Sequence, residues 1–269
     1  MASEKLTIQI AVVSGGASGM GRVYALRMAT QGIAVAVLDR SESALAELAT
    51  LSENIHPYTC DVTNIEQVRH IIDTIEQRLG PVDRLVHCAA IMPTGTLAAQ
   101  PIGDVHQLMA VNYGGTVNVV SAILPRLKKR NMGQLVIFGS LGGYVPVPDC
   151  GAYCASKAAV NLFAEILIEE NRGSGVHILL VCPPLVDTPL LQQATATGNP
   201  KTVRDSIQNK RFATADGMID ALEVGLHRKT TILYPNSEAN VLAWLRRFSP
   251  RLVWKVIHAA NRVQTETAK

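Results

Sequence analysis

Short apolar runs alternate with longer stretches of helical period along most of this 269-residue chain. The apolar runs suit strands buried on both faces of a sheet, and they lie at residues 8–13, 34–38, 55–59, 85–88, 135–138, 176–181 and 231–234. The stretches of helical period lie at residues 21–31, 41–51, 65–79, 102–129, 152–172 and 215–227. Because parallel strands need crossover helices, this alternation predicts an α/β fold: a doubly wound parallel sheet of about seven strands with helices on both faces.

Composition limits the class of protein. Hydrophobic residues make up 48% of the chain and charged residues 17%, so the chain is able to bury a large core. We expect one domain over residues 1–235, followed by a C-terminal amphipathic helical tail over residues 236–269. The net charge of +3 is too small for the dense basic stripe of a nucleic-acid-binding protein.

Cysteine usage and the termini indicate a cytoplasmic setting. The five cysteines are odd in number and form no C-x-x-C pair, which predicts reduced thiols. No companion His or Cys lies at ligand spacing from Cys150 and Cys154, so we expect no metal site. Residues 1–9 show no secretory signal, and apolar runs such as residues 33–38 and 176–182 are too short to cross a membrane.

The first apolar run leads into a glycine-rich turn, SGGASGMG at residues 14–21. Glycine lets the backbone bend sharply and approach anionic oxygens, and the helix that follows points its positive end at them, although tight turns also use glycine for backbone reasons alone. Asp39 lies about 18 residues beyond Gly21, close to the spacing of a carboxylate that binds a ribose hydroxyl. Together they predict a Rossmann-type dinucleotide site. The carboxylate repels a 2′-phosphate and favours NAD, while Arg40 offsets part of that repulsion and leaves NADP possible.

Tyr153 and Lys157 are four residues apart in a stretch of helical period, so their side chains emerge on one face. A neighbouring ammonium stabilises a phenolate, which makes the tyrosine a usable acid or base nearer neutral pH. Ser140 follows the apolar run at residues 135–138, at the edge where open α/β sheets place their ligands, and its hydroxyl is suited to hold a substrate oxygen. The Tyr-x-x-x-Lys pair by itself is also common in solvated helices.

In its motifs and their order the chain resembles the short-chain dehydrogenase/reductase family over nearly its whole length. The motifs are residues 14–21 and 183–188 with Asp39, Asp61, Asn112, Ser140, Tyr153 and Lys157. The resemblance implies that Tyr153 exchanges a proton with the substrate oxygen while hydride passes between carbon and nicotinamide. It also implies that Lys157 lowers the tyrosine pKa and binds the ribose, that Ser140 stabilises the substrate oxygen, and that Asn112 supports a water-linked proton path.

The same resemblance implies two sets of binding residues. The cofactor set is Ser14, Gly15, Ser18, Gly19, Met20, Gly21, Asp39, Arg40, Asp61, Val62, Ala89, Ala90, Tyr153, Lys157, Pro183, Val186 and Thr188. The substrate set is Ser140, Leu141, Tyr153 and Leu185. Asp61 would contact the adenine, and its alternative role is a helix cap before Asn64.

Three segments depart from the family pattern. Ser14 replaces a threonine, the segment HCAA at residues 87–90 replaces an Asn-Asn-Ala-Gly type segment, and Pro184 replaces a glycine. Cys88 loses an amide that would brace the central strand, and Pro184 fixes φ in a loop that borders the nicotinamide. His87 and His177 are interpreted as strand-end packing or solvent-facing residues without a catalytic role.

Three further features concern the substrate lid, the association of subunits and the tail. Residues 188–212 occupy the position of the family's mobile substrate lid and are mainly polar, and the 102–129 and 152–172 segments resemble the helices through which the family forms dimers and tetramers. Both tryptophans lie in the tail, where residues 240–262 include no acidic residue. This pattern is typical of a basic amphipathic element at a membrane surface, and the alternative is a helix packed on the subunit or on an oligomer partner.

These observations predict an NAD(P)-dependent oxidoreductase that interconverts a secondary alcohol and a ketone, with a hydrophobic or lipid-like substrate as a hypothesis. The alternative from another class is a non-catalytic dinucleotide-binding sensor or scaffold protein, against which Ser140, Tyr153 and Lys157 argue. An epimerase or dehydratase of an extended relative is disfavoured because the chain after Tyr153 is too short for a large substrate domain.

Overall fold

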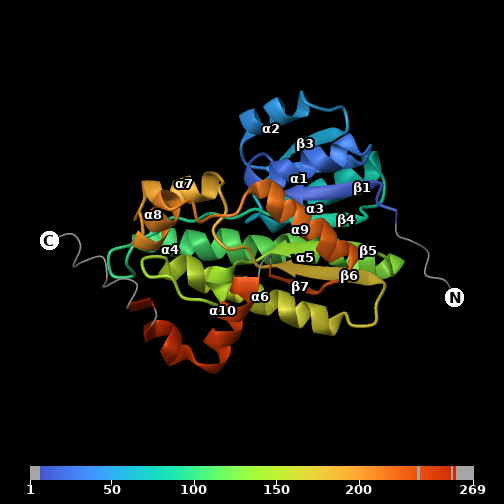
Figure 1. Cartoon of the computed structure of the whole chain (residues 1–269). Coiled ribbons are helices and arrows are strands. Elements are labelled where there is room, and N and C mark those ends of the chain that lie inside the picture. The colour runs from blue at the N-terminus through green and yellow to red at the C-terminus, as the bar shows by residue number, and fades with distance from the viewer. Residues whose placement is uncertain (1–6, 235–236, 256, 259–269) are drawn as a thin grey trace.

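The computed structural model describes residues 7–234, 237–255 and 257–258. At its centre lies a sheet of seven parallel strands in the order β3-β2-β1-β4-β5-β6-β7 (Figure 1). The strands are β1 Ile10–Ser14, β2 Ala34–Asp39, β3 Ile55–Thr59, β4 Arg84–His87, β5 Gly133–Phe138, β6 Val176–Val181 and β7 Ile232–Leu233. Each apolar run of the sequence supplies one strand, so the predicted doubly wound sheet is confirmed.

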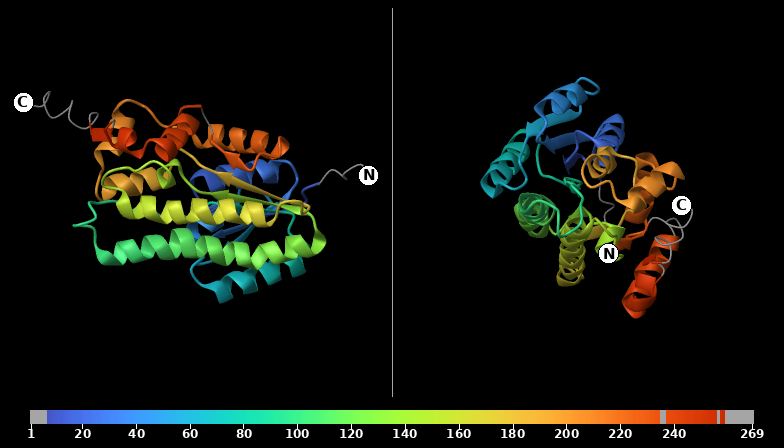
Figure 2. Two further views of the ribbon diagram at one scale, coloured as in Figure 1. Left: turned by 90° about the horizontal axis from the view of Figure 1, so that it is seen from below. Right: turned by 90° about the vertical axis from the view of Figure 1, so that its left-hand side faces the viewer.

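Helices cover both faces of the sheet (Figure 2). The helices of one face are α1 Gly19–Thr30, α2 Glu42–Ala49 and α9 Ala215–His227, and those of the other are α3 Ile65–Arg78, α5 Gly115–Arg130 and α6 Gly151–Glu170. Alternate strand residues point to opposite faces, so Val12 enters the core beneath α3 and α5 whereas Val13 enters the core beneath α1 and α9. This burial on both sides explains why the five inner strands read as continuous apolar runs. The edge strands β3 and β7 are only partly buried, so the prediction that residues 55–59 are buried on both faces is wrong.

The stretch predicted as one helix over residues 102–129 is interrupted. It consists of α4 Ile102–Leu108, the π-helical turn η1 Met109–Gly114 and α5. Asn112 lies in this turn and is fully buried, and its amide bonds the backbone of Ile91. Period alone does not reveal such an inserted turn, because the tertiary contact of the Asn112 amide helps to hold it. Single π-turns inside α-helices are common at functional sites.

Two helical segments are long and apolar enough to cross a membrane by length and composition, Ile102–Arg130 and Gly151–Glu170. They exceed the short runs on which the expectation of no membrane span rested. About half of each apolar stretch is buried, and both segments pack on the sheet. That packing accounts for their apolar composition.

Helix caps and free thiols complete the description of the local structure. Ser41 is the N-cap of α2 and accepts a hydrogen bond from the Ala44 amide at 3.3 Å. Gly32 and Gly80 follow helices with positive φ angles of 79° and 114°. The five cysteines are free. Within the described residues no group of His, Cys, Asp or Glu is placed to hold a metal.

The remaining elements follow β5 and β6. They are the short η2 Leu141–Gly143, α7 Pro189–Ala196, α8 Lys201–Gln208 and the tail helix α10 Ser237–Phe248. A second helical stretch begins at Pro250, as the Ser-Pro step predicts. The boundary expected between residues 235 and 236, and the tail positions 256 and 259–269, lie outside the described residues.

Candidate active site

The site lies at the carboxyl ends of the strands, where the chain order in the sheet reverses between β1 and β4. Open α/β sheets bind ligands at such a switch point. Two cavities meet here, a groove of about 400 Å³ beside the glycine turn and a pocket of about 300 Å³ over the end of β5. Both are lined by Met20, Cys88, Ala90, Thr188 and Leu190. They therefore form one continuous cleft.

The glycine turn is shaped so that side chains are excluded. Gly15 has a φ of 66°, and a Cβ on it would lie 2.6 Å from the Cα of Ala89. A Cβ on Gly21 would lie 2.3 Å from the carbonyl oxygen of Gly15. The turn and the first residues of α1 therefore fold against each other and against the end of β4 at a distance that only glycine allows.

The start of α1 offers backbone donors to the groove. Its N-cap, Ser18, makes no side-chain capping bond, and no acidic residue occupies the first turn. Gly19 and Met20 line the groove beside these amides. Unpaired N–H groups at the positive end of a helix fit an anionic diphosphate. The residues present thus fit the diphosphate of a dinucleotide.

Acidic side chains lie at the far end of the groove. Asp39 at the end of β2 accepts hydrogen bonds from the amides of Ala17 and Ser41, both at 3.1 Å, which fix its carboxylate. Asp61 lines the same groove and accepts two bonds from Thr63, while Asn64 is the N-cap of α3. Asp61 therefore faces the groove and also holds the turn through Thr63, and the cap of α3 is Asn64 and not Asp61. Arg40 and Val62 complete this end.

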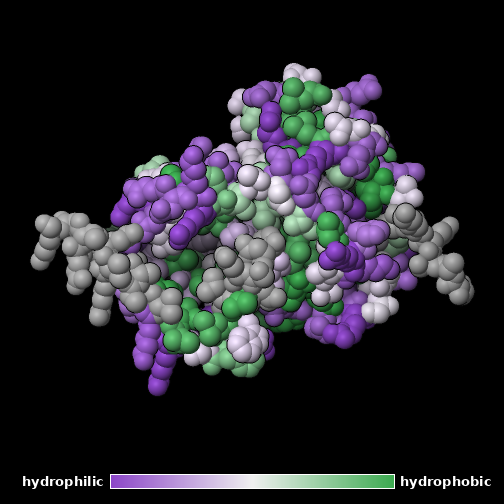
Figure 3. All heavy atoms as spheres, in the orientation of Figure 1, coloured by the Kyte–Doolittle hydropathy of each residue, from purple (hydrophilic) through white to green (hydrophobic). Residues whose placement is uncertain are grey.

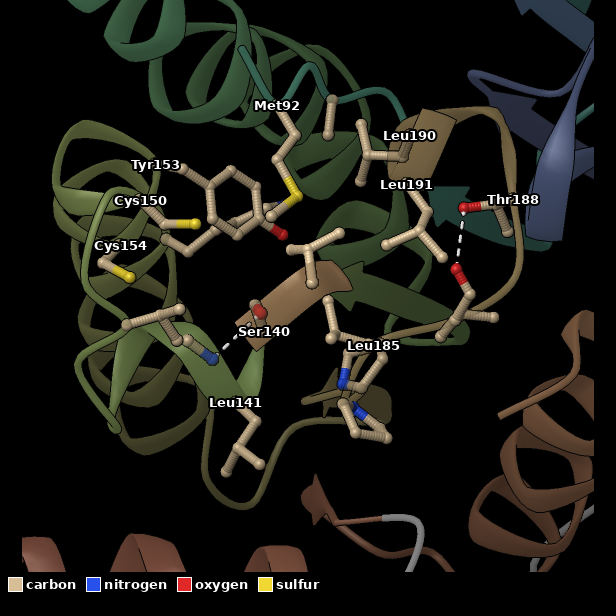
Figure 4. A pocket seen from close by; sticks show the side chains of 18 of the residues that line it. Met92, Ser140, Leu141, Cys150, Tyr153, Cys154, Leu185, Thr188, Leu190 and Leu191 are labelled. Atoms are coloured by element: carbon tan, nitrogen blue, oxygen red, sulfur yellow. Dashed lines mark hydrogen bonds between the residues drawn. The ribbon is translucent and has the colours of Figure 1, made fainter. Parts of the chain in front are cut away.

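The pocket is lined by the three predicted catalytic residues Ser140, Tyr153 and Lys157. The first two are labelled in Figure 4. Ser140 follows β5, and Tyr153 and Lys157 lie one turn apart at the start of α6. All three are buried, and the Tyr153 hydroxyl is directed into the pocket on the same side as Ser140 (Figure 4). The Lys157 ammonium donates to the carbonyl oxygen of Phe138 at 2.9 Å. An ammonium has three donors, so two remain for other partners.

Burial dominates the acidity of both groups. It raises the pKa of Tyr153 to about 12, against a lowering by the hydrogen bond with Ser140. It also lowers the pKa of Lys157 to about 8. The expected lowering of the tyrosine pKa by Lys157 is not among the influences in this structure, and desolvation outweighs the one lowering influence, the hydrogen bond with Ser140. At neutral pH the phenol therefore holds its proton.

Asn161 is a functional residue that the sequence reasoning missed. Its amide bonds the backbone of Ser140 twice, accepting from the N–H at 3.2 Å and donating to the carbonyl at 2.9 Å. A Cβ on Gly139 or Gly143 would lie 2.0 Å or 2.4 Å from this amide. Asn161 continues the Tyr153 and Lys157 face by one more turn, and that spacing is the signal that would have found it.

Asn112 lines neither cavity. Besides Ile91, its amide donates to the hydroxyl of Ser156 at 3.0 Å, and Ser156 donates to the carbonyl of Tyr153 at 2.8 Å. The side chain thus ties the β4 loop to the start of α6. Its predicted part in a proton path stays a prediction, and the contacts described here position Tyr153.

Ser14, which was predicted to bind the cofactor, also lines neither cavity. It is fully buried, and its hydroxyl lies 2.6 Å from Nδ1 of His87 on the neighbouring strand. His87 is therefore a strand-end packing residue, the first of the two alternatives predicted for it. Its Nε2 has no hydrogen-bond partner. Burial, and to a lesser extent Lys157, lowers the pKa of His87 to about 3.

This burial predicts an acid-sensitive fold. The pKa of His87 in the folded protein lies below the 6.5 of an ordinary histidine, so protonation favours the unfolded chain and stability is lost as pH falls below about 6.5. From pH 7 to pH 5 the wild type should lose about 2 kcal/mol relative to His87→Asn, whose amide does not titrate. Denaturant titrations of both proteins at the two pH values measure this difference. An equal change in both would contradict it.

The loop after β6 borders the pocket through Pro183, Pro184, Leu185 and Val186. It is held on both sides, because Pro183 accepts a bond from Leu141 and Leu185 accepts one from Ala213, each at 2.9 Å. Pro184, which fixes φ in this loop, lines the pocket between the two anchored residues. Thr188 then begins α7 beside Gly19.

The pocket is mainly apolar, and residues of α7 and α8 form part of its lining. The predicted substrate residues Leu141 and Leu185 line the pocket, together with Met92, Val145 and Val147. Tyr144 does not, and its hydroxyl bonds Glu165. The 188–212 segment, read as polar, adds an apolar inner face with Leu190, Leu191 and Val203. Arg211 lies at its end, on the pocket lining.

Comparison with known proteins gives the same picture. A family model described as short chain dehydrogenase matches residues 9–199. This chain belongs to the short-chain dehydrogenase/reductase family. A crystal structure of a short chain dehydrogenase/reductase from Burkholderia phymatum in complex with NAD is similar in fold, with a TM-score of 0.80 at 23% identity over 93% of this chain and 96% of that one.

Two curated relatives extend the comparison. Probable oxidoreductase EphD of Mycobacterium tuberculosis is 30% identical over 254 residues, 89% of this chain and 43% of EphD. This chain thus spans less than half the length of EphD. The 3-ketodihydrosphingosine reductase of Bos taurus is 28% identical over 253 residues, 82% of this chain and 76% of the reductase.

Proposed function

We propose that this protein is an NAD(P)-dependent oxidoreductase that interconverts a secondary alcohol and a ketone. The observation that carries the proposal is the convergence of Ser140, Tyr153 and Lys157 on one pocket that is continuous with the groove beside the glycine turn. A bound nicotinamide supplies or takes up the hydride. Tyr153 donates a proton to the carbonyl oxygen during reduction and accepts one from the hydroxyl during oxidation.

The other residues orient this exchange. Ser140 holds the substrate oxygen beside Tyr153, and Asn161 fixes the Ser140 backbone. Lys157, anchored on Phe138, keeps two ammonium donors for other partners, and one of them is available to the ribose of the cofactor. Ser156 and Asn112 brace the helix turn that carries Tyr153. Pre-organised groups of this kind act without reorganising during the reaction.

The pocket lining favours a hydrophobic substrate. Leucine, valine and methionine side chains surround Tyr153, and the two lid helices add Leu190, Leu191 and Val203. One relative is named for a long-chain keto lipid. We therefore propose an apolar, lipid-like ketone or alcohol as the substrate class.

A substrate panel tests the proposal. Purified protein is mixed with apolar and polar ketones or secondary alcohols, each with NAD(H) and with NADP(H), and reduced nicotinamide is followed by its absorbance. We expect turnover with apolar members. Dinucleotide binding without turnover of any member would support the sensor or scaffold role instead.

Asp39 favours NAD as the cofactor, because its fixed carboxylate would repel a 2′-phosphate. In Asp39→Asn one backbone contact to the side-chain oxygen is retained while the charge is lost. We expect the preference for NAD over NADP to fall by about tenfold or more, since hydrogen bonds to a charged group contribute about 1.5–3 kcal/mol. Titration calorimetry with both dinucleotides measures this. Asp104→Asn on exposed α4 is the control, and an unchanged preference in Asp39→Asn would contradict the assignment.

The apolar outer face of α4 and α6 suits self-association. Ile102, Met109, Leu162 and Ile166 are exposed there. We propose a homodimer or homotetramer through these helices, and elution as a monomer in gel filtration would argue against it.

A further inference from the structure

The tail presents an apolar face to solvent. Val241, Trp244 and Phe248 are 62%, 61% and 65% exposed, and their spacing places them on one side of α10. The Trp244 and Phe248 rings pack on each other, with centroids 4.9 Å apart. Leu252 and Trp254 continue the exposed apolar surface beyond Ser249, while Val253 between them is buried and anchors the segment. These five exposed residues are called the tail patch below.

All charged residues in the stretch that carries the tail patch, residues 241–255, are basic. Arg247, Arg251 and Lys255 are exposed beside it, and residues 240–262 include no Asp or Glu. None of the ion pairs in the described part of the chain involves these three side chains. Exposed tryptophan beside exposed arginine and lysine is the composition of an element that lies in a membrane interface.

The tail patch lies at the end of the molecule that carries the substrate pocket. The tail runs along the same end as α7 and α8, which form part of the pocket lining (Figures 1 and 2). Hydrophobic side chains gather at this end in the space-filling view, in the area of α10 (Figure 3). A surface bound to the tail would therefore be close to the lid.

Charge decides what covers the tail patch. In a two-fold dimer the same patch meets itself, which would bring Arg247, Arg251 and Lys255 of both copies together without an acidic partner among residues 240–262. An anionic lipid surface instead satisfies the cations and takes up the aromatic side chains. We propose that residues 241–255 are a docking surface for bilayers with anionic headgroups, on which the enzyme lies with its pocket beside the lipid.

The test uses the full chain and vesicles of phosphatidylcholine, alone or mixed with phosphatidylglycerol. Trp244 and Trp254 are the only tryptophans of the chain, so tryptophan emission reports on the tail alone. We expect a shift to shorter wavelength and protection from acrylamide with anionic vesicles at low salt, and reversal at high salt. Unchanged emission together with no flotation on anionic vesicles would overturn the proposal.

Charge variants sharpen the test. Arg247→Gln, Arg251→Gln and Lys255→Gln combined should lower vesicle partitioning by roughly a hundredfold, because each basic residue near an anionic surface contributes about fivefold. The matched control neutralises Arg69, Arg78 and Arg172, which are exposed elsewhere, and should bind as the wild type. Equal loss in both sets would reduce the effect to net charge and contradict a dedicated surface.

Two further arms separate the alternatives. If the tail patch is an interface between copies, Phe248→Ser lowers the oligomeric state in gel filtration and vesicles leave the emission unchanged, which overturns the proposal. Tyr153→Phe should bind vesicles as tightly as the wild type. Docking is therefore measured independently of turnover, and a failure of the proposed activity would leave this result standing.

Discussion

Replacing Tyr153 by phenylalanine should lower turnover by about a thousandfold while leaving dinucleotide affinity and folding stability close to those of the wild type. The variant removes only the hydroxyl that lies in the pocket with Ser140, and loss of one positioned acid or base costs roughly 10²–10⁴ in rate. The ring stays and keeps its packing with the lid helices. Steady-state rates with a substrate found in the panel measure the effect.

The neighbouring phenol of Tyr144 supplies the control. It bonds Glu165 and does not line the pocket, so Tyr144→Phe should keep turnover within about threefold of the wild type. Turnover that survives Tyr153→Phe would remove Tyr153 from the proposed chemistry. Comparable losses in both variants would indicate a structural effect of phenol removal.

Replacing Gly21 by alanine should abolish most dinucleotide binding. The added Cβ would lie 2.3 Å from the carbonyl oxygen of Gly15, a distance at which the turn has to open. We expect the dissociation constant for NAD(H) to rise at least a hundredfold, because the backbone donors of the turn move. Unfolding free energy should fall by about 1–3 kcal/mol, the usual cost of overpacking.

Gly103→Ala is the matched control, since a Cβ at this helical position in α4 meets nothing within 4 Å. There the same substitution should be neutral or stabilise the helix by up to about 1 kcal/mol. Calorimetric titration with NAD(H) and denaturant unfolding measure both variants. Normal binding by Gly21→Ala would mean that the cofactor lies elsewhere.

The period of the apolar residues and the positions of the glycines predict most of the fold. A strand buried on both faces of a sheet has to be apolar at successive positions, so the five inner strands are visible as apolar runs, and the parallel arrangement follows from the helices between them. The turn at residues 14–21 was equally visible, because positions without room for a Cβ admit glycine alone. Tyr153 and Lys157 were found because an α-helix places residues four apart on one face.

Other properties arise only where distant segments meet. The π-turn at Asn112, the clamp of Asn161 on Ser140 and the buried contact between Ser14 and His87 each join residues 21 to 73 positions apart. The high pKa of Tyr153 likewise reflects desolvation by the folded surroundings, which sequence spacing does not encode. The chain by itself determined which chemistry is present and on which elements. Packing decided the solvent exposure, the pKa and the hydrogen-bond partners of each group, because burial and contact are properties of the assembled core.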